Sequence, residues 1–361
     1  MTQTTSRSLR HAAGSLLVVG LSATELTGLE RAWLKLVRPS GIILFRRNIT
    51  DAAQTRALLA EATAYCNTAN MRAVDIEGGT VDRLRDAVAP MPSAQAVAAT
   101  GKLKLMQRHG ELIARETLAF GFNTTLAPVL DLALPVSAAV MGTRVADADP
   151  MKVVAYVRAF LDGLGSHGVV GCGKHFPGLG GGTLDSHHET PAIERSMREL
   201  WSEDLIPYRE LVRELPMVMV NHATYPQTRS GDVPATASSY WITNVLLKRI
   251  GYRGLVFSDD MEMGGILKYA PMEEAAILAV RAGIHMMEIC HSPELILRCY
   301  ESLVSEAERS AAFRKLLLDR ARVAGRLRRA RFRAPMARAL TAKGLDGLRA
   351  QVLKFKSEVE A

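Results

Sequence analysis

The chain has 361 residues, of which 48% are hydrophobic and 23% are charged. This composition excludes a disordered or fibrous protein and suffices for one large domain or two small ones. The formal charge of +8 at first suggests a polyanionic partner. However, residues 309–361 hold 15 Lys/Arg and 4 Asp/Glu, a charge of +11, whereas residues 1–308 hold 30 and 33, a charge of −3. The basic excess is therefore a property of the C-terminal segment, and we expect no nucleic-acid partner.

The cysteines and the N-terminal residues indicate in which cellular compartment the protein resides. The four cysteines show no CxxC spacing, so they suggest neither a disulfide scaffold nor a cysteine zinc site. An apolar run over residues 12–21 follows a basic lead and is either the core of a signal peptide or a buried first strand. The strand is favoured because helix-like sequence follows directly and the run is too short to span a bilayer. We therefore expect a cytoplasmic protein without stable membrane insertion.

Short β-branched runs recur along the chain with helical patterns between them, which is typical of βα units and a parallel sheet. Eight runs are strand candidates: GSLLVVGL (14–21), GIILF (41–45), RAVDIEGG (72–79), TLAPVLDL (125–132), GVVGCGKHF (168–176), PMVMVNHA (216–223), GLVFSDD (254–260) and IHMMEIC (284–290). Their nearly continuous apolar character suits strands that are covered outside by helices and inside by a barrel core. Capping residues precede three helical stretches: Thr50, Asp149 before Pro150, and Ser292 before Pro293.

Eight βα units in about 300 residues favour a (β/α)8 TIM barrel over an open doubly wound sheet. No GxGxxG follows the first strand and no GxxxxGK[ST] occurs, so dinucleotide and P-loop sites lose their main support. We expect a catalytic barrel over residues 1–308 and a basic helical extension over residues 309–361. Apolar residues from Phe313 to Leu327 recur at helical spacing in that extension, with arginines opposite. Packing of this apolar face on the core is favoured over contact with an anionic surface.

Ionisable residues collect where the predicted strands end, which in a TIM barrel is the site of chemistry. Five consecutive strand candidates end in such residues: Asp75 and Glu77, Asp131, Lys174 and His175, His222, and Asp259 and Asp260. Buried polar groups that merely satisfy loop backbone would explain one or two of these positions. Five of them indicate an active site at the rim of the barrel.

The stretch from residue 171 to 191 is the richest in chemistry. Six glycines lie between residues 171 and 182, and Asp185 and His187 follow. An aspartate beside a histidine fixes its tautomer and makes a proton donor and acceptor near neutral pH. Surface histidines are one alternative, and a metal site of His175, Asp185, His187 and His222 is another. The absence of HxH and HExxH motifs and the neighbouring Lys174 speak against a metal, and we expect no metal or cofactor.

The segment KHFPGLGGGTLDSHHETP (174–191) resembles the signature of glycoside hydrolase family 3, specifically its single-domain bacterial β-N-acetylglucosaminidases of cell-wall recycling. Further matching motifs are GIILFRRNI (41–49), VDIEGGTVDRL (74–84), LAPVLDL (126–132), MGTRVADADP (141–150), MVNHATYP (219–226) and FSDDMEM (257–263). The resemblance runs from residue 14 to about residue 300 and leaves the tail uncovered. It implies a retaining exo-β-N-acetylglucosaminidase that acts on N-acetylglucosamine linked to anhydro-muramic acid or its peptides.

The resemblance also implies residue roles. Asp259 becomes the nucleophile, and His187, oriented by Asp185, becomes the general acid/base. The residues implied to bind the sugar in the −1 subsite are Asp75, Arg144, Lys174 and His175, with Arg83 and His222 nearby. These roles fit a retaining glycosidase, which needs one carboxylate to attack the anomeric carbon and a second group to protonate the leaving oxygen. Lys174 would help to keep Asp259 ionised.

Three positions depart from the pattern of the family. Leu179 stands where relatives commonly have His, Glu262 where they have Ser, and His285 where they have Asp. Because the nucleophile and dyad positions are intact, these departures bear on loop placement and aglycone choice. Three alternatives therefore stay open: a hydrolase or phosphorylase of another β-sugar such as a glucoside or xyloside, a metal-dependent barrel hydrolase, and a non-catalytic sugar-binding relative.

Overall fold

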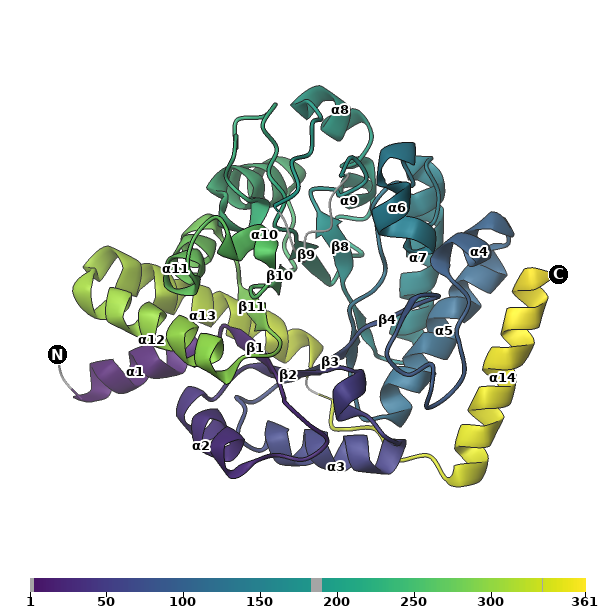
Figure 1. The fold of residues 1–361 in the computed structure, drawn as a ribbon, viewed down its shortest axis with the longest axis horizontal. Coiled ribbons are helices and arrows are strands. Elements are labelled where there is room, and N and C mark those ends of the chain that lie inside the picture. Colours follow the sequence, from purple (N-terminus) through teal and green to yellow (C-terminus); the bar gives the residue numbers. More distant parts are fainter. Residues whose placement is uncertain (1–2, 183–189, 333) are drawn as a thin grey trace.

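The computed structural model describes residues 3–182, 190–332 and 334–361, and its centre is a nearly closed barrel of parallel strands surrounded by helices (Figure 1). The barrel strands described are β1 (Leu17–Gly20), β2 (Gly41–Leu44), β3 (Met71–Val74), β6 (Thr124–Thr125), β7 (Val170–Gly171), β8 (Gly173–Phe176), β9 (Met217–Val220), β10 (Leu255–Asp260) and β11 (Met286–Ile289). Their order is β7-β6-β3-β2-β1-β11-β10-β9-β8. Only Cys172 separates β7 from β8, so one continuous stretch of chain forms both edges of the sheet. This arrangement confirms the predicted TIM-barrel class.

All eight predicted strands are present, and three of them differ markedly from the prediction. The fifth divides into β7 and β8 around Cys172. The fourth is reduced to Thr124–Thr125, because Pro128 has no N–H to donate, and the pairing resumes only as a bridge from Val129 to Lys174.

The predicted third strand is shorter than expected because the chain turns away after Val74. Residues 76–82 form a hairpin of β4 (Ile76–Gly78) and β5 (Val81–Asp82). Gly78 adopts a φ of +87°, and a Cβ there would approach the carbonyl oxygen of Pro92 to 2.1 Å. Only glycine fits this turn, which carries Glu77 and Arg83 across the rim.

Helices cover the outside of the barrel. Those up to residue 309 are α1 (Gln3–Gly14), α2 (Gly28–Val37), α3 (Ala52–Thr63), α4 (Ala94–Ala99), α5 (Leu103–Ala119), α6 (Ala138–Met141), α7 (Pro150–Ser166), α8 (Met197–Ser202), α9 (Ile206–Glu210), η5 (Tyr240–Ile250), α10 (Gly264–Leu267), α11 (Met272–Ala282) and α12 (Pro293–Arg309), with short turns η1 (Arg46–Asn48), η2 (Pro135–Ser137), η3 (Gly142–Arg144) and η4 (Ala235–Ala237). Asp149 and Ser292 cap α7 and α12 as predicted. The cap of α3 is Asp51 and not Thr50, because the Asp51 carboxylate accepts from the amide of Gln54.

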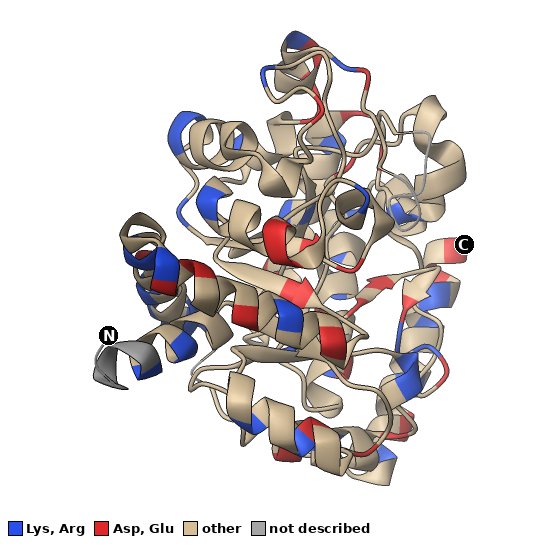
Figure 2. Ribbon diagram, turned by 60° about the vertical axis from the view of Figure 1, so that its left-hand side comes forward, with Lys and Arg blue, Asp and Glu red and all other residues tan. Residues whose placement is uncertain are grey.

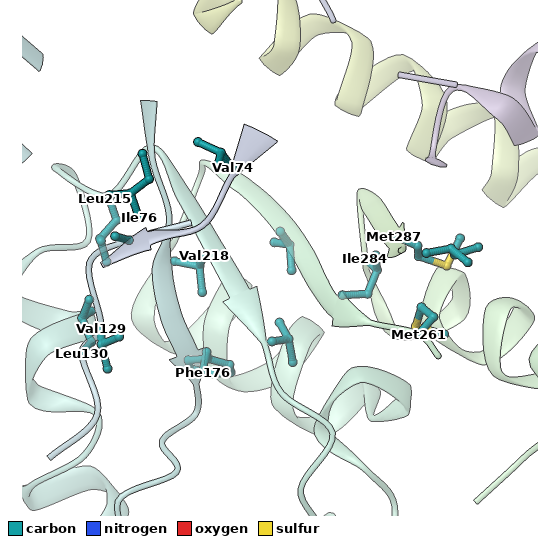
Figure 3. Close-up of a cluster of buried hydrophobic side chains, with 14 of the residues drawn as sticks. Val74, Ile76, Val129, Leu130, Phe176, Leu215, Val218, Met261, Ile284 and Met287 are labelled. Carbon is teal, nitrogen blue, oxygen red and sulfur yellow. The ribbon is translucent and has the colours of Figure 1, made fainter. Parts of the chain in front are cut away.

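The apolar core has two shells. Side chains such as Val18, Phe257 and Met286 fill the barrel interior. The alternate residues of the strands point outward and pack under the helices; Figure 3 shows part of this outer shell, including Val74 on β3 and Val218 on β9. The period of two along each strand therefore assigns side chains to the inside or the outside of the barrel.

The basic C-terminal segment forms two helices, α13 (Ala311–Arg331) and α14 (Ala342–Glu360). Phe313 and Leu317 on α13 are buried against the outer shell, whereas Leu327 and Phe332 pack on the inner shell. The apolar face of this helix therefore packs on the core, as predicted, and α13 covers the end of the barrel where the strands begin. Phe355 and its neighbours on α14 pack along α5 (Figure 1). The division of the chain at residue 308 stays a prediction.

Charges on the outer helices are mixed. Both basic and acidic residues lie on α11 and α12, where Arg298 pairs with Glu273 and Arg281 pairs with Glu306 (Figure 2). Exposed pairs of this kind contribute little to stability. Among the described residues, no helix is long and apolar enough to cross a membrane.

Candidate active site

A buried ion cluster occupies the rim of the barrel at β3 and β8. Lys174 Nζ on β8 lies 2.9 Å from Asp75 Oδ1 and 2.6 Å from Glu77 Oε1. Arg144, from the loop before α7, holds Glu77 through two parallel contacts of 2.8 Å. Burial alone would raise the pKa of Glu77, but Arg144 and Lys174 outweigh it and hold that pKa well below its usual value. The cluster therefore presents two fixed cations and two carboxylates to the mouth of the barrel.

His175 is fixed from both sides. Its Nδ1 lies 2.7 Å from Asp131 Oδ2, which also accepts from the His175 amide at 3.1 Å. Its Nε2 lies 3.4 Å from Arg144 Nη2, and the second oxygen of Asp131 accepts from the Leu179 amide at 2.7 Å. Because an ionised carboxylate only accepts, the Nδ1 atom of His175 carries the hydrogen.

Asp259 and Asp260, adjacent at the end of β10, have opposite electrostatic environments. Burial favours the neutral form of Asp259, but His175, His222, the Asp260 amide at 2.9 Å and Lys174 together hold the pKa of Asp259 below its ordinary value. Burial, reinforced by the negative charge of Glu262, raises the pKa of Asp260 to about 7. Asp259 thus stays ionised at neutral pH, whereas Asp260 is only partly ionised there.

His222 and Arg83 lie at the edges of this cluster. His222 Nε2 donates to the carbonyl oxygen of Asp260 at 3.0 Å, and burial lowers the pKa of His222. The neutral ring therefore turns a lone pair at Nδ1 toward its surroundings, where no partner lies among the residues that the structure describes. Arg83 Nη2 approaches Asp75 Oδ2 to 3.8 Å. Every predicted binding residue that is described thus belongs to one connected rim.

Asp185 and His187 lie outside the described residues, in the segment 183–189. The chain on both sides of this segment is fastened to the rim. Upstream, the Leu179 amide donates to Asp131; downstream, the Thr190 hydroxyl donates to the carbonyl oxygen of Gly265 at 3.0 Å. Leu179 and Thr190, which flank the segment, are therefore both held at the mouth of the barrel.

Two members of the metal site considered from sequence, His175 and His222, are among the described residues, and each has one ring nitrogen engaged by the protein. The Nδ1 atom of His175 already binds Asp131, and the Nε2 atom of His222 already donates to a carbonyl oxygen. A different group, Asp260, Glu262 and His291, has ligand atoms within 4.8 Å of one another. However, the Glu262 carboxylate already accepts from three backbone amides, those of Cys290, His291 and Ser292. The Glu262 carboxylate therefore holds the loop after β11 to the loop after β10.

Comparison with known proteins decides the family. The family model described as the Glycosyl hydrolase family 3 N terminal domain matches residues 8–323. A beta-hexosaminidase of Alkalilimnicola ehrlichii is 38% identical over 287 residues, which are 78% of this chain and 82% of that protein. A beta-hexosaminidase of Glaesserella parasuis is 33% identical over 290 residues, or 80% of this chain and 84% of that protein.

The chain belongs to glycoside hydrolase family 3. The crystal structure of NagZ from Neisseria gonorrhoeae in complex with N-trifluoroacetyl-D-glucosamine superposes with a TM-score of 0.77 at 29% identity, covering 96% of this chain and 98% of that one. The predicted family resemblance is confirmed, and the protein is a glycoside hydrolase of the beta-hexosaminidase type.

The three departures from the family 3 pattern have structural explanations. Leu179 anchors Asp131 through its backbone amide, which any residue would supply, and its side chain packs in the outer shell. Glu262 joins the loop after β10 to the loop after β11. His285 lies at the opposite end of the barrel, where its Nδ1 accepts from the Val256 amide at 3.1 Å. Burial lowers the pKa of His285 to about 3, so this ring is neutral.

Sequence reasoning gave three carboxylates at the rim and inside the barrel no individual role. Glu77 and Asp131 were recognised only as ionisable strand ends, although they hold Lys174, Arg144 and His175 in place. Glu288 was not singled out. Its signal was a single carboxylate inside the apolar run IHMMEIC.

Proposed function

We propose that this enzyme is a retaining exo-β-N-acetylglucosaminidase that removes terminal β-linked N-acetylglucosamine from peptidoglycan fragments in the cytoplasm. In its double displacement, Asp259 attacks the anomeric carbon and a glycosyl-enzyme intermediate forms, which water then hydrolyses. The observation that carries the proposal is the contrast within the aspartate pair, because the surroundings of Asp259 hold its pKa below the ordinary value while burial raises the pKa of Asp260 to about 7. A nucleophilic carboxylate needs this environment.

The proposed general acid/base is His187, oriented by Asp185, in the segment between Leu179 and Thr190, two residues that hydrogen-bond to the rim. A neutral imidazole can protonate the leaving oxygen in the first step only after it has gained a proton. The carboxylate of Asp185 favours that charged form, and the same ring then deprotonates water in the second step.

The sugar-binding role is proposed for Asp75, Arg144, Lys174, His175, Arg83 and His222. Their fixed charges and hydrogen-bonding atoms suit a ring that is rich in hydroxyl groups, and their mutual contacts hold them in place before substrate arrives. The complex of the Neisseria gonorrhoeae relative with an N-acylated glucosamine supports N-acetylglucosamine as the sugar. The cytoplasmic setting is supported by four free, buried cysteines.

A panel of 4-nitrophenyl β-glycosides, assayed with and without phosphate, tests this proposal. We expect the highest kcat/KM on the N-acetyl-β-glucosaminide, with little turnover of the β-glucoside and β-xyloside and no acceleration by phosphate. A higher kcat/KM on the β-glucoside or the β-xyloside would contradict the proposed specificity for N-acetylglucosamine. Release of a sugar 1-phosphate would show a phosphorylase instead.

A further inference from the structure

The site contains a further acid, Glu288 on β11, that no step above uses. Met286 and Cys290, two residues before and after it, belong to the inner shell of the barrel, whereas Met287 and Ile289 belong to the outer shell. Because side chains alternate along a strand, Glu288 points into the barrel. Its residue is only 4% exposed.

The neighbours of Glu288 place it beside the catalytic rim. Its backbone pairs in register with Asp260, and its amide donates to the Ser258 hydroxyl at 3.0 Å. Burial is the main reason why the pKa of Glu288 lies well above its usual value. The negative charges of Asp260, Asp259 and Asp75 raise this pKa further. The side chain is therefore a neutral carboxylic acid at neutral pH.

The two oxygens of Glu288 differ. Oε1 accepts from the thiol of Cys290 at 3.0 Å, so it acts as the carbonyl oxygen of the acid. Oε2, which then carries the proton, is buried and has no partner within residues 3–182, 190–332 and 334–361. An unsatisfied buried donor lowers the free energy of unfolding by about 1–3 kcal/mol. The stability of the fold therefore does not explain why an acid stands at this position.

We propose that Glu288 is a further substrate-binding residue, whose Oε2 hydroxyl donates a hydrogen bond to an oxygen of the sugar in the −1 subsite. This inference rests on the proposed function, because it assumes that a sugar enters between Asp259 and Asp75. A hydroxyl oxygen or the acetamido carbonyl oxygen would accept from such a neutral donor. Since the acid carries no charge, it adds a donor without adding a third anion beside Asp75 and Asp259.

Four variants of the full chain test this inference: Glu288→Gln, Glu288→Leu, Glu116→Gln and Glu116→Leu. Glu116 on α5 is a matched control, because it is also a buried carboxyl whose pKa burial raises, and both its oxygens lack partners among the described residues. It lies on the outer helix α5 and is not one of the residues proposed to bind the sugar. kcat, KM and Tm are measured for each variant on the 4-nitrophenyl N-acetyl-β-glucosaminide.

We expect Glu288→Leu to lower kcat/KM about 10- to 100-fold, the loss of one well-placed hydrogen bond. Glu288→Gln should stay within about threefold of wild type, because its amide N–H can donate from the same place. Both Glu116 variants should match wild type. Tm should hold or rise in both Leu variants, because each removes an unpartnered polar group.

A Glu288→Leu enzyme with wild-type kcat/KM would overturn the inference and leave the proposed function standing. A parallel loss of activity and Tm in both Glu288 variants would also overturn it, since that pattern marks a structural role. If the wild type turns over no glycoside on the panel, the proposed function fails separately. Calorimetric binding of N-acetylglucosamine then decides: tighter binding by wild type than by Glu288→Leu supports the inference, and equal binding overturns it.

Discussion

Asp131 and His175 are joined twice, through the backbone amide of His175 at 3.1 Å and through its Nδ1 at 2.7 Å, and both bonds end on the same carboxylate oxygen. This pair fixes the position of the strand end and the orientation of the ring together. The other oxygen of Asp131 holds the Leu179 amide at the start of the glycine-rich loop. Asp131 therefore joins the proposed sugar-binding cluster to Leu179, which precedes the segment with the proposed acid/base.

Replacing Asp131 by Asn should lower kcat/KM about 10- to 100-fold, because an amide cannot accept at both of its ends and one of these contacts is lost. The assay is hydrolysis of the 4-nitrophenyl N-acetyl-β-glucosaminide. Glu30→Gln is the control, since Glu30 is a buried carboxylate on α2 that also accepts from two backbone amides. It should lose stability and keep its activity. Equal activity of both variants would refute the role given to Asp131.

Glu77→Gln should reduce the free energy of unfolding by about 3–5 kcal/mol at pH 7, because it leaves Lys174 and Arg144 buried beside a neutral group. The folded-state pKa of Glu77 lies below its ordinary value, so the stability that it contributes is fully present above about pH 4.5. That contribution is lost as the pH falls from there through the folded-state pKa. Denaturant unfolding between pH 7 and pH 3 should therefore show the gap between variant and wild type narrowing, and a constant gap would contradict this account.

Two truncations separate the roles of the C-terminal helices. A chain ending at residue 341 lacks α14 and uncovers the side of α5, so it should fold with a lower Tm. A chain ending at residue 310 also lacks Leu327 and Phe332, which pack on the inner shell, and it should aggregate or fail to fold. Soluble expression and thermal melts check both. A stable, active chain ending at residue 310 would show that the end of the barrel needs no cover.

The tail also poses a question about surfaces. Its basic residues, 15 of the 45 in the chain, gave rise to the alternative of contact with an anionic surface. Packing accounts for the apolar face of α13 without such a partner.

Proton NMR of the first-formed sugar tests the stereochemistry. A double displacement inverts the anomeric carbon twice, so the β anomer should appear first and then mutarotate. The measurement is a time course at high enzyme concentration with the aryl N-acetyl-β-glucosaminide. Initial appearance of the α anomer would exclude a glycosyl-enzyme intermediate.

Much of the fold and rim could be predicted from the sequence, because the signals are local. The apolar runs mark the strands, and Lys174, His175 and Asp259 stand at their ends, where a parallel barrel brings them together. The two-contact pairing of Glu77 with Arg144 joins residues 67 positions apart. No period or motif encodes such a pairing, since it depends on how the hairpin and the loop before α7 cross the rim.

Two further features of the structure could not be predicted from the sequence for a similar reason. Phe332 follows the predicted helical pattern of residues 313–327, and the sequence does not show that it meets the inside of the barrel. Glu288 lies in a run whose apolar character predicts a strand, and only the alternation of inner and outer neighbours in the folded barrel shows that its carboxyl points into the barrel.

The most direct test of the central claim is the rate at which Asp259→Asn hydrolyses the 4-nitrophenyl N-acetyl-β-glucosaminide, with Asp260→Asn as the adjacent control. Asn at residue 260 can still accept from the Glu262 amide, as Asp260 does at 3.0 Å. We predict that kcat falls by at least about 10⁴-fold in Asp259→Asn, because the attacking carboxylate is gone. In Asp260→Asn it should fall less than about tenfold. An Asp259→Asn enzyme with kcat near the wild-type value would contradict the account.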